Sequence, residues 1–471
     1  DGNTAVGYLS LNANTTGASN VAMGHQAGKS TTTGTCNIAI GTDARRDGTT
    51  GDNNVAIGFQ SLRESETANN NTAVGHISLQ QNTTGNSNTA VGTCSLNDNT
   101  EGTGNSAVGR NALANNTTAD YNVAVGYDSL FTNTTGHSNT AVGFNTMCVN
   151  TTGDCNVAIG KDALDSNTEG DCNTAIGTDA LQANTTASQN TAVGSSALAA
   201  NTTGSNNTAL GTCALLVNTT GIRNTALGHR ALDANTDGTC NTAVGFTSLS
   251  ANVGGDFNTA VGLEALKDNT TANNNVAVGI QALKLNTTGS SLTAVGSYTL
   301  DENTTGSSNT AIGSSALNKN TTGDFNIAVG SNALCKNVTS DANTAVGYFS
   351  LRCNTAANNT AVGMCSLGAN TTGTANTAIG RDALTANTTA SENTAIGFQS
   401  LCKNTTGCLN TALGFKTMCL NTTGCENVAI GQNALRANTT GDFNIGIGRD
   451  ALISNTTADS NVAVGFCSLA A

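Results

Sequence analysis

One repeated unit with a period of 17 makes up this chain, and it limits the possible folds more than any other feature. A typical copy, Asn-Thr-Ala-Val-Gly-Phe-Asn-Thr-Met-Cys-Val-Asn-Thr-Thr-Gly-Asp-Cys, runs from Asn139 to Cys155 and begins again at Asn156. The consensus is N-T-A-V-G-x-x-A-L-x-x-N-T-T-G-x-x, whose residues we number as positions 1 to 17. Chains with a short fixed period fold as stacks in which each repeat contacts only its neighbours.

The period is almost free of interruptions. The unit recurs without a slip from Asn3 to Asn343 and again from Asn359 to Asn461, and only the unit at 343–358 is shorter, by a single residue. There are 27 complete units and a partial one. We therefore expect one continuous body, with a small local offset at the short unit and no domain boundary there.

The residues of the unit favour short strands and turns. Position 5 is Gly in all 28 units, position 3 is Ala in all but one, and position 4 is always Val, Ile, Leu or Met. A Gly in every unit would interrupt a helix, whereas Thr-Ala-Val is typical of a strand. We predict one strand at positions 2–4, a second at the Ala-Leu of positions 8 and 9, and turns after each. The predicted fold is an all-β, parallel β-solenoid over 1–471, with one coil per repeat and a rise of ~4.8 Å per coil.

Composition excludes several classes of protein. Proline and tryptophan are absent, aromatic residues make up 3%, and the formal net charge is −13. This charge disfavours nucleic acids and anionic membranes as partners, because both attract basic patches. No apolar run approaches the ~18 residues of a transmembrane helix, so we expect no membrane insertion. No signal peptide is visible, and neither end carries a polar cap, so we expect a segment of a longer fibre.

Two arrangements of the strand remain open. Side chains at positions 2 and 4 point to one side of a strand, and those at positions 3 and 5 point to the other. In the arrangement that we favour, positions 2, 4 and 9 fill the coil, and the alanines at position 3 are buried against a second chain at close range. In the alternative, these alanines lie inside a very thin coil.

Asn at position 12 occurs in 24 of the 27 complete units. Its amide both donates and accepts, so stacked copies can form a hydrogen-bonded ladder from coil to coil. In 19 complete units the same Asn begins an N-x-T sequon, which can be N-glycosylated. We favour the ladder, since glycans on successive coils would be crowded. The asparagines of these sequons are Asn14, Asn82, Asn116, Asn133, Asn150, Asn184, Asn201, Asn218, Asn269, Asn286, Asn303, Asn320, Asn337, Asn370, Asn387, Asn404, Asn421, Asn438 and Asn455.

The 15 cysteines all occupy variable positions of the unit. Stacked Cα atoms ~4.8 Å apart fall within the disulfide range of about 4.4–6.8 Å, so cysteines that share a position in consecutive coils are disulfide candidates. Three pairs do so: Cys155 with Cys172, Cys402 with Cys419, and Cys408 with Cys425. Cys335 and Cys353 lie one position apart in adjacent coils. The aligned pairs favour an oxidising compartment.

We expect no catalytic, cofactor or metal site. Val-Gly-x-x-Ala looks like a hexapeptide of the left-handed β-helix acyltransferases, but positions 10 to 17 supply no further hexads. Three histidines share position 6 in non-adjacent coils, His137 lies at position 16, and no catalytic carboxylate can be placed opposite them. No C-x-x-C motif suggests zinc. The Asp residues that recur at position 16 could bind Ca²⁺, but solvated single carboxylates explain them better.

The first complete coils after Asn20 are irregular. Gly28 and Arg45 replace the Leu of position 9, and charged residues gather at 45–47 and 63–66. These coils form either a local binding surface or a terminal region in which the repeat has degenerated, and we favour the second interpretation.

The units Asn-Val-Ala-Ile-Gly at 54–58, 156–160 and 427–431 resemble the head repeats of trimeric autotransporter adhesins. The resemblance runs along the whole chain but is close only at positions 1 to 8, because A-L-x-x-N-T-T-G replaces the family's shorter turn. The Asn-Thr-Thr-Gly arrays are also similar to those of phage and viral fibre proteins. The resemblance implies a left-handed β-roll, a trimer, and an extracellular or cell- or virion-surface protein that attaches to a host or cell-surface receptor.

Two functions follow from these features. The first is a structural or adhesive extracellular fibre, a homo-oligomer that displays variable residues at positions 6, 7, 10, 11, 16 and 17. The second is an ice-binding solenoid with Thr and Asn ladders on its surface. Against the second, Thr at position 2 alternates with Val and Ile, as in a buried row.

Overall fold

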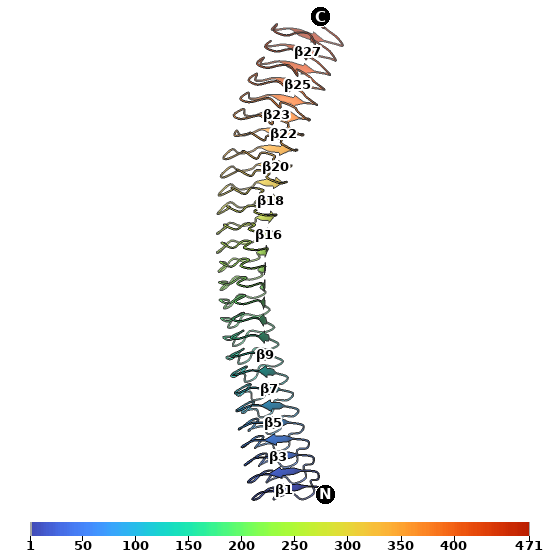
Figure 1. Ribbon diagram of the computed structural model, residues 1–471. Coiled ribbons are helices and arrows are strands. Elements are labelled where there is room, and N and C mark those ends of the chain that lie inside the picture. Colours follow the sequence, from blue (N-terminus) through green and yellow to red (C-terminus); the bar gives the residue numbers. More distant parts are fainter. Residues whose placement is uncertain (1, 471) are drawn as a thin grey trace. The chain divides into compact units, whose positions relative to one another are not determined.

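The computed structural model of the chain describes residues 2–470. Its contacts divide the chain into two units, Asp1–Gly238 and Thr239–Ala471, which have the same architecture. Each unit is a parallel β-solenoid in which every coil contributes one short strand and the rest of the coil forms turns (Figure 1). The described residues contain no helix.

The strands lie at positions 2–4 of the repeat, as predicted. Those of the first unit are β1 (Thr4–Val6), β2 (Val21–Met23), β3 (Ile38–Ile40), β4 (Val55–Ile57), β5 (Thr72–Val74), β6 (Thr89–Val91), β7 (Ser106–Val108), β8 (Val123–Val125), β9 (Thr140–Val142), β10 (Val157–Ile159), β11 (Thr174–Ile176), β12 (Thr191–Val193), β13 (Thr208–Leu210) and β14 (Thr225–Leu227). Those of the second unit are β15 (Thr242–Val244), β16 (Thr259–Val261), β17 (Val276–Val278), β18 (Thr293–Val295), β19 (Thr310–Ile312), β20 (Ile327–Val329), β21 (Thr344–Val346), β22 (Thr360–Val362), β23 (Thr377–Ile379), β24 (Thr394–Ile396), β25 (Thr411–Leu413), β26 (Val428–Ile430), β27 (Ile445–Ile447) and β28 (Val462–Val464).

Within each unit, strands pair in parallel with the next strand along the chain, and equivalent positions lie opposite one another. In the first unit Ala175 of β11 pairs with Ala192 of β12. The short unit keeps the same register, since Thr344 of β21 pairs with Thr360 of β22. The missing residue is therefore absorbed in the turn that follows position 12.

The interior of the coil corrects one expectation and confirms another. Ala192 at position 3 and Leu198 at position 9 are both 0% exposed within the single chain. Burial of position 9 is confirmed, but the arrangement that we favoured, with position 3 against a second chain, is wrong. Positions 2 and 4 point outwards instead. A coil this thin has room opposite the Leu column only for Ala, because protein interiors are close-packed.

The second strand predicted at Ala-Leu is also wrong, because this segment is a turn. Positions 7, 9 and 17 adopt positive φ in non-glycine residues, with values of 56° at Ser196, 53° at Leu198 and 63° at Asn206. Such backbone is rare for residues with a side chain. Bonds between coils stabilise it, since the Leu198 amide donates to the Ala214 carbonyl at 3.0 Å.

Position 5 requires glycine for two reasons. Gly194 has a φ of +133°, and an added Cβ would lie 2.7 Å from the carbonyl carbon of Gly211 in the next coil. A side chain at this position would both strain the backbone and force two coils apart.

Candidate interaction surface

The outward side chains of positions 2 and 4 form a charge-free strip along each unit, which we call the Thr/aliphatic face. Position 2 is Thr, Val, Ile or Ser in all 28 strands, and position 4 is always aliphatic or Met. Leu210 and Leu227 remain 37% and 46% exposed, and Ile312 in the second unit is 41% exposed. Exposed apolar side chains that form one continuous patch mark interaction sites more often than scattered ones do.

Strand register aligns this face into ladders of similar side chains. In the first unit Ile176, Val193 and Leu210 follow one another in β11, β12 and β13. The second unit repeats the arrangement with another aliphatic row at position 4. The face therefore presents nearly the same surface at every coil.

Aromatic residues at position 6 form stacks beside this face. The rings of Tyr127 and Phe144 lie 5.4 Å apart, and the Arg110 guanidinium lies 5.4 Å from the Tyr127 ring. Phe398 and Phe415 in the second unit repeat the 5.4 Å stack. These groups extend the apolar surface beyond the strand.

Sequence reasoning missed these stacks, although their shared position in the repeat was a sufficient signal. Two of the position-6 histidines belong to them. His25 stacks on Tyr8 at 5.5 Å and His76 on Phe59 at 5.3 Å. A ring contact thus accounts for the placement of these two side chains.

The asparagines of position 12 form the ladder that we favoured over glycosylation. Asn99 Nδ2 donates to Asn82 Oδ1 of the preceding coil at 2.7 Å and to the Gly102 carbonyl of its own coil at 3.0 Å. The amides are buried, as at Asn201, which is 0% exposed. A glycan on Nδ2 would replace one of its two hydrogens and so remove at least one of these bonds.

A second ladder at position 1 was not anticipated. Asn173 Oδ1 accepts the backbone amide of Asn190 at 3.0 Å, and Asn190 Nδ2 donates to the Gly204 carbonyl at 3.0 Å. The carbonyl of position 15 therefore receives donors from the asparagines of both ladders. Each of these side chains both accepts and donates a hydrogen bond. This requirement explains why both positions are Asn rather than any small polar residue.

All 15 cysteines are thiols in the structure. The Sγ atoms of Cys408 and Cys425 lie 3.3 Å apart, compared with ~2.05 Å in a disulfide bond. Cys155 and Cys172 occupy the same turn position in consecutive coils, and desolvation and the charge of Cys172 raise the pKa of Cys155. Disulfide formation at these pairs stays a prediction.

Cys402 and Cys419 also lie close together. Cys402 Sγ lies 3.3 Å from the Cys419 carbonyl oxygen. The hydrogen bond between the two thiols, together with one from Arg436, lowers the pKa of Cys419. Cys335 Sγ, one position out of line with Cys353, lies 3.6 Å from the Arg352 carbonyl oxygen.

The aspartates of position 16, single carboxylates on a solvated turn, also accept hydrogen bonds from the backbone of the preceding coil. Asp154 Oδ1 accepts the backbone amide of His137 at 2.6 Å, and Asp171 Oδ1 accepts that of Asp154 at 2.8 Å. His137 does the same through Nδ1, which accepts the Asp120 amide at 2.9 Å. Among residues 2–470 no group of three His, Cys, Asp or Glu side chains is placed to hold a metal ion.

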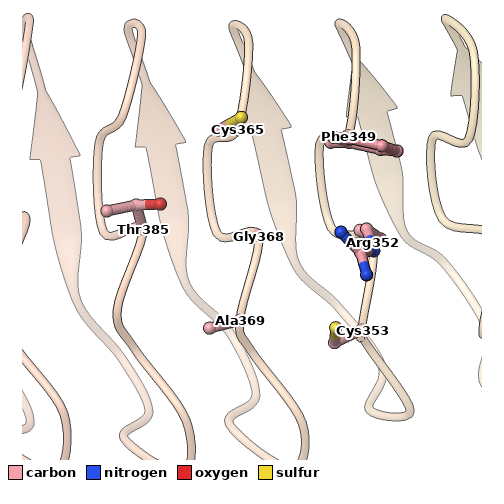
Figure 2. A pocket seen from close by; sticks show the side chains of 7 residues that line it. All are labelled: Phe349, Arg352, Cys353, Cys365, Gly368, Ala369 and Thr385. Carbon is pink, nitrogen blue, oxygen red and sulfur yellow. The ribbon is translucent and has the colours of Figure 1, made fainter.

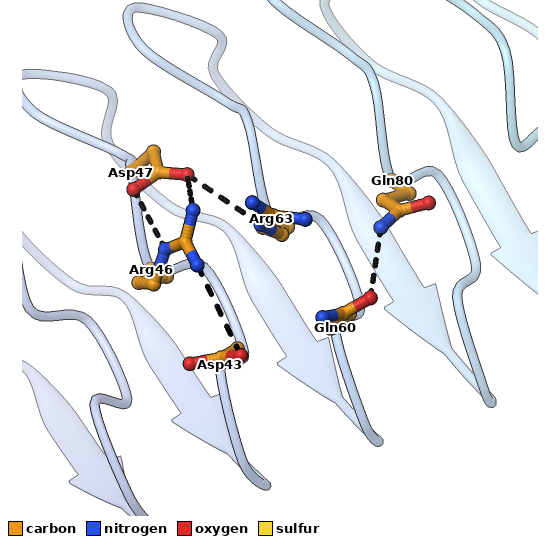
Figure 3. Close-up of polar contacts among 6 residues, drawn as sticks. All are labelled: Asp43, Arg46, Asp47, Gln60, Arg63 and Gln80. Carbon is orange, nitrogen blue, oxygen red and sulfur yellow. Dashed lines mark hydrogen bonds and ion pairs between the residues drawn. The ribbon is translucent and has the colours of Figure 1, made fainter.

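The charged residues of the irregular coils bind one another at the surface. Arg46 Nε donates to Asp47 Oδ1 at 2.9 Å, and Arg46 lies 4.0 Å from Asp43 (Figure 3). Arg63 approaches the same Asp47 carboxylate at 3.6 Å, and Gln80 donates to Gln60 at 3.0 Å. The charges of Arg46, Asp47 and Arg63 are thus paired within the chain.

Arg45 replaces a core Leu and is fully buried. Its guanidinium donates to Thr31 Oγ1 at 3.0 Å and to the Gly51 carbonyl at 2.7 Å, whereas Nε has no partner. Desolvation by burial lowers the pKa of Arg45 to about 10. The side chain occupies the space that Asn would fill at position 12, where this coil has Gly48.

The chain matches no protein family model and no curated protein sequence. The resemblance to adhesin head repeats therefore rests on the repeat motif alone. In the described residues, no helix has the length and apolar character needed to cross a membrane.

Proposed function

We propose that the protein is a structural, adhesive fibre of the cell or virion exterior that self-associates through the Thr/aliphatic face. The observation that carries the proposal is this exposed, charge-free face, which repeats at every coil of both units. A surface of this kind is stabilised when a second apolar surface covers it.

The size of the face supports self-association. Strands of this length are ~10 Å long and ~4.8 Å apart, so the fourteen strands of the first unit present roughly 670 Å². A standard protein interface buries about 800 Å² on each partner. The face of one unit together with its position-6 column approaches that size.

A second copy of the same chain is the partner that fits best. Every copy has the same coil rise, so two parallel faces stay in step along their whole length. Symmetric homo-oligomers are built from such self-matching surfaces. The resemblance to adhesin heads favours three copies. The variable positions 7, 10, 11, 16 and 17, which lie outside this surface, would then contact the receptor.

The test is the mass of the native particle, measured by mass photometry and sedimentation. Wild-type protein should be an oligomer. Val193→Glu with Leu210→Glu should weaken it while β-rich circular dichroism persists, because unpaired buried charges cost several kcal/mol. Ala183→Glu with Ala200→Glu at position 11 is the matched control and should leave the mass unchanged. A monomeric wild-type protein would refute self-association.

Ice binding is the second candidate. The structure removes the objection that the sequence raised against it. Position 2 is Thr in 17 of the 28 strands, and these side chains lie on the outside of the coil rather than in a buried row. Regular Thr ladders on a flat sheet are the feature that an ice-binding surface needs. Thermal hysteresis in a monomeric wild-type protein would favour ice binding over the fibre.

A further inference from the structure

A notch of about 310 Å³ opens in the side of the second unit, away from the Thr/aliphatic face (Figure 2). It lies where the short unit meets the next two coils. The residues that line it occupy positions 7, 10 and 11 of three successive coils: Phe349, Arg352, Cys353, Cys365, Gly368, Ala369 and Thr385.

Gly368 is the reason for the notch. It is the only glycine that the chain has at position 10, where its neighbours in the column are Arg352 and Thr385. Every other coil places a side chain at this point of the surface. An added Cβ at Gly368 would lie 3.2 Å from the Cys365 carbonyl oxygen, so a side chain here would be tight as well as space-filling.

Arg352 is held at the mouth of the notch by an aromatic ring. Its guanidinium lies 4.8 Å from the Phe349 ring, and that ring packs on Tyr348 with centroids 3.9 Å apart. Stacking of this kind fixes the plane of a guanidinium and leaves its N–H edge free to donate.

The donors of Arg352 are not used within the chain. Among residues 2–470 no carboxylate forms an ion pair with it, and no side-chain hydrogen bond engages it. Arg381 and Arg449 also stack on rings, but each pairs with the neighbouring aspartate, at 3.3 Å and 3.1 Å. Arg352 thus combines a fixed position with an unneutralised charge.

We propose that this notch binds a small organic carboxylate with an apolar or aromatic body. The free N–H edge of Arg352 donates to the two carboxylate oxygens, whose spacing a guanidinium matches. Phe349, Ala369 and the thiols of Cys353 and Cys365 form the apolar wall, and the Thr385 hydroxyl supplies a further polar group. The volume is at the lower limit of small-molecule sites. None of the residues that line the notch belongs to the Thr/aliphatic face, and Phe349 contacts the position-6 column through Tyr348.

Saturation-transfer difference NMR tests the proposal, with benzoate as the probe and the full chain as the protein. Benzoate should bind, whereas benzamide and inorganic phosphate should bind at least tenfold more weakly. Arg352→Met should weaken benzoate binding roughly tenfold or more, because a hydrogen-bonded charge pair is lost. Gly368→Asn should abolish binding by filling the notch, and Asn is present at position 10 in other coils.

Arg436→Met is the matched control, since Arg436 lies at position 10 outside the notch and its loss should leave benzoate binding unchanged. Circular dichroism checks that each variant keeps its fold. Equal binding of phosphate and benzoate, no binding of benzoate, or an unchanged affinity in Arg352→Met would each overturn the proposal.

Discussion

Restoring the consensus at Arg45 and Gly48 should give its full stabilising effect only when both residues change. Arg45 occupies two places in its coil, the Leu site of position 9 and the amide site of position 12. Gly48 makes this arrangement possible, because an added Cβ there would lie 2.8 Å from Cζ and 2.9 Å from Cγ of Arg45. The double variant Arg45→Leu with Gly48→Asn replaces one buried cation by the two side chains that most other coils use.

The expected gain in stability comes from removing the buried charge of Arg45 and from the hydrogen bonds that Asn would form at position 48. Burial lowers the pKa of Arg45 from 12.5 to about 10, which corresponds to ~3 kcal/mol of cost to the charged form in the folded state. The double variant removes this cost. Its new amide can also bond Thr31 Oγ1 and the Ser65 hydroxyl, which is buried without a partner. We expect a gain of up to ~3 kcal/mol in local stability.

Neither single change should give this gain. Arg45→Leu also removes the burial cost of the charge, but it leaves Thr31 Oγ1 without its donor, which offsets about 1–3 kcal/mol of that gain. Gly48→Asn alone forces its side chain into the guanidinium, and overpacking costs about 1–3 kcal/mol.

Native-state hydrogen exchange of peptides covering 37–65 measures all four proteins, because solenoid coils open locally. The wild type should also gain stability as the pH rises from about 10 to 12.5, since the unfolded chain then binds the Arg45 proton more tightly than the fold does. Single effects that add to the double effect within ~0.5 kcal/mol would refute the shared-space reasoning.

Three further predictions concern other parts of the chain. Leu198→Asp should lower the melting temperature by burying an unpaired charge in the coil, whereas Ala200→Asp at the surface should not; equal melting curves would place position 9 outside. Non-reducing peptide mapping after mild oxidation should find Cys408 linked to Cys425, and free thiols at both would remove this support for an oxidising compartment. Glu264, whose pKa is lowered to about 2 mainly by its hydrogen bond with Lys284, stabilises the fold fully above pH 4.5 and loses this effect as the pH falls through 2. Glu264→Gln should therefore flatten the pH dependence of melting in this range, and an unchanged profile would contradict it.

The repeat was sufficient to predict the parallel stack, the strand at positions 2–4 and the buried Leu198 column. It was not sufficient to decide which side of the strand faces inwards. Both candidate sides were uniform in sequence, and the choice depends on the width of the coil, which only three-dimensional packing determines. Ala192 fits opposite Leu198, whereas a Val would not.

The turns were harder to predict for a different reason. Leu is a poor residue for positive φ, so nothing in the Ala-Leu dipeptide suggests that Leu198 adopts 53°. Inter-coil hydrogen bonds override this local preference. The notch at Gly368 also escaped notice, because a single small residue becomes a cavity only when its neighbours Arg352 and Thr385 are known to stack above and below it.

The register across the short unit has a consequence for how such a chain changes in length. Thr344 and Thr360 pair as well as any residues separated by a full repeat, so a coil tolerates the loss of a turn residue without disturbing the strands on either side. Addition or removal of a whole coil would disturb the structure even less. The two coils brought together would form the same asparagine ladders and the same strand pairing. Unequal recombination within the gene could therefore produce longer and shorter variants that all fold, and length would be a freely adjustable trait of this protein.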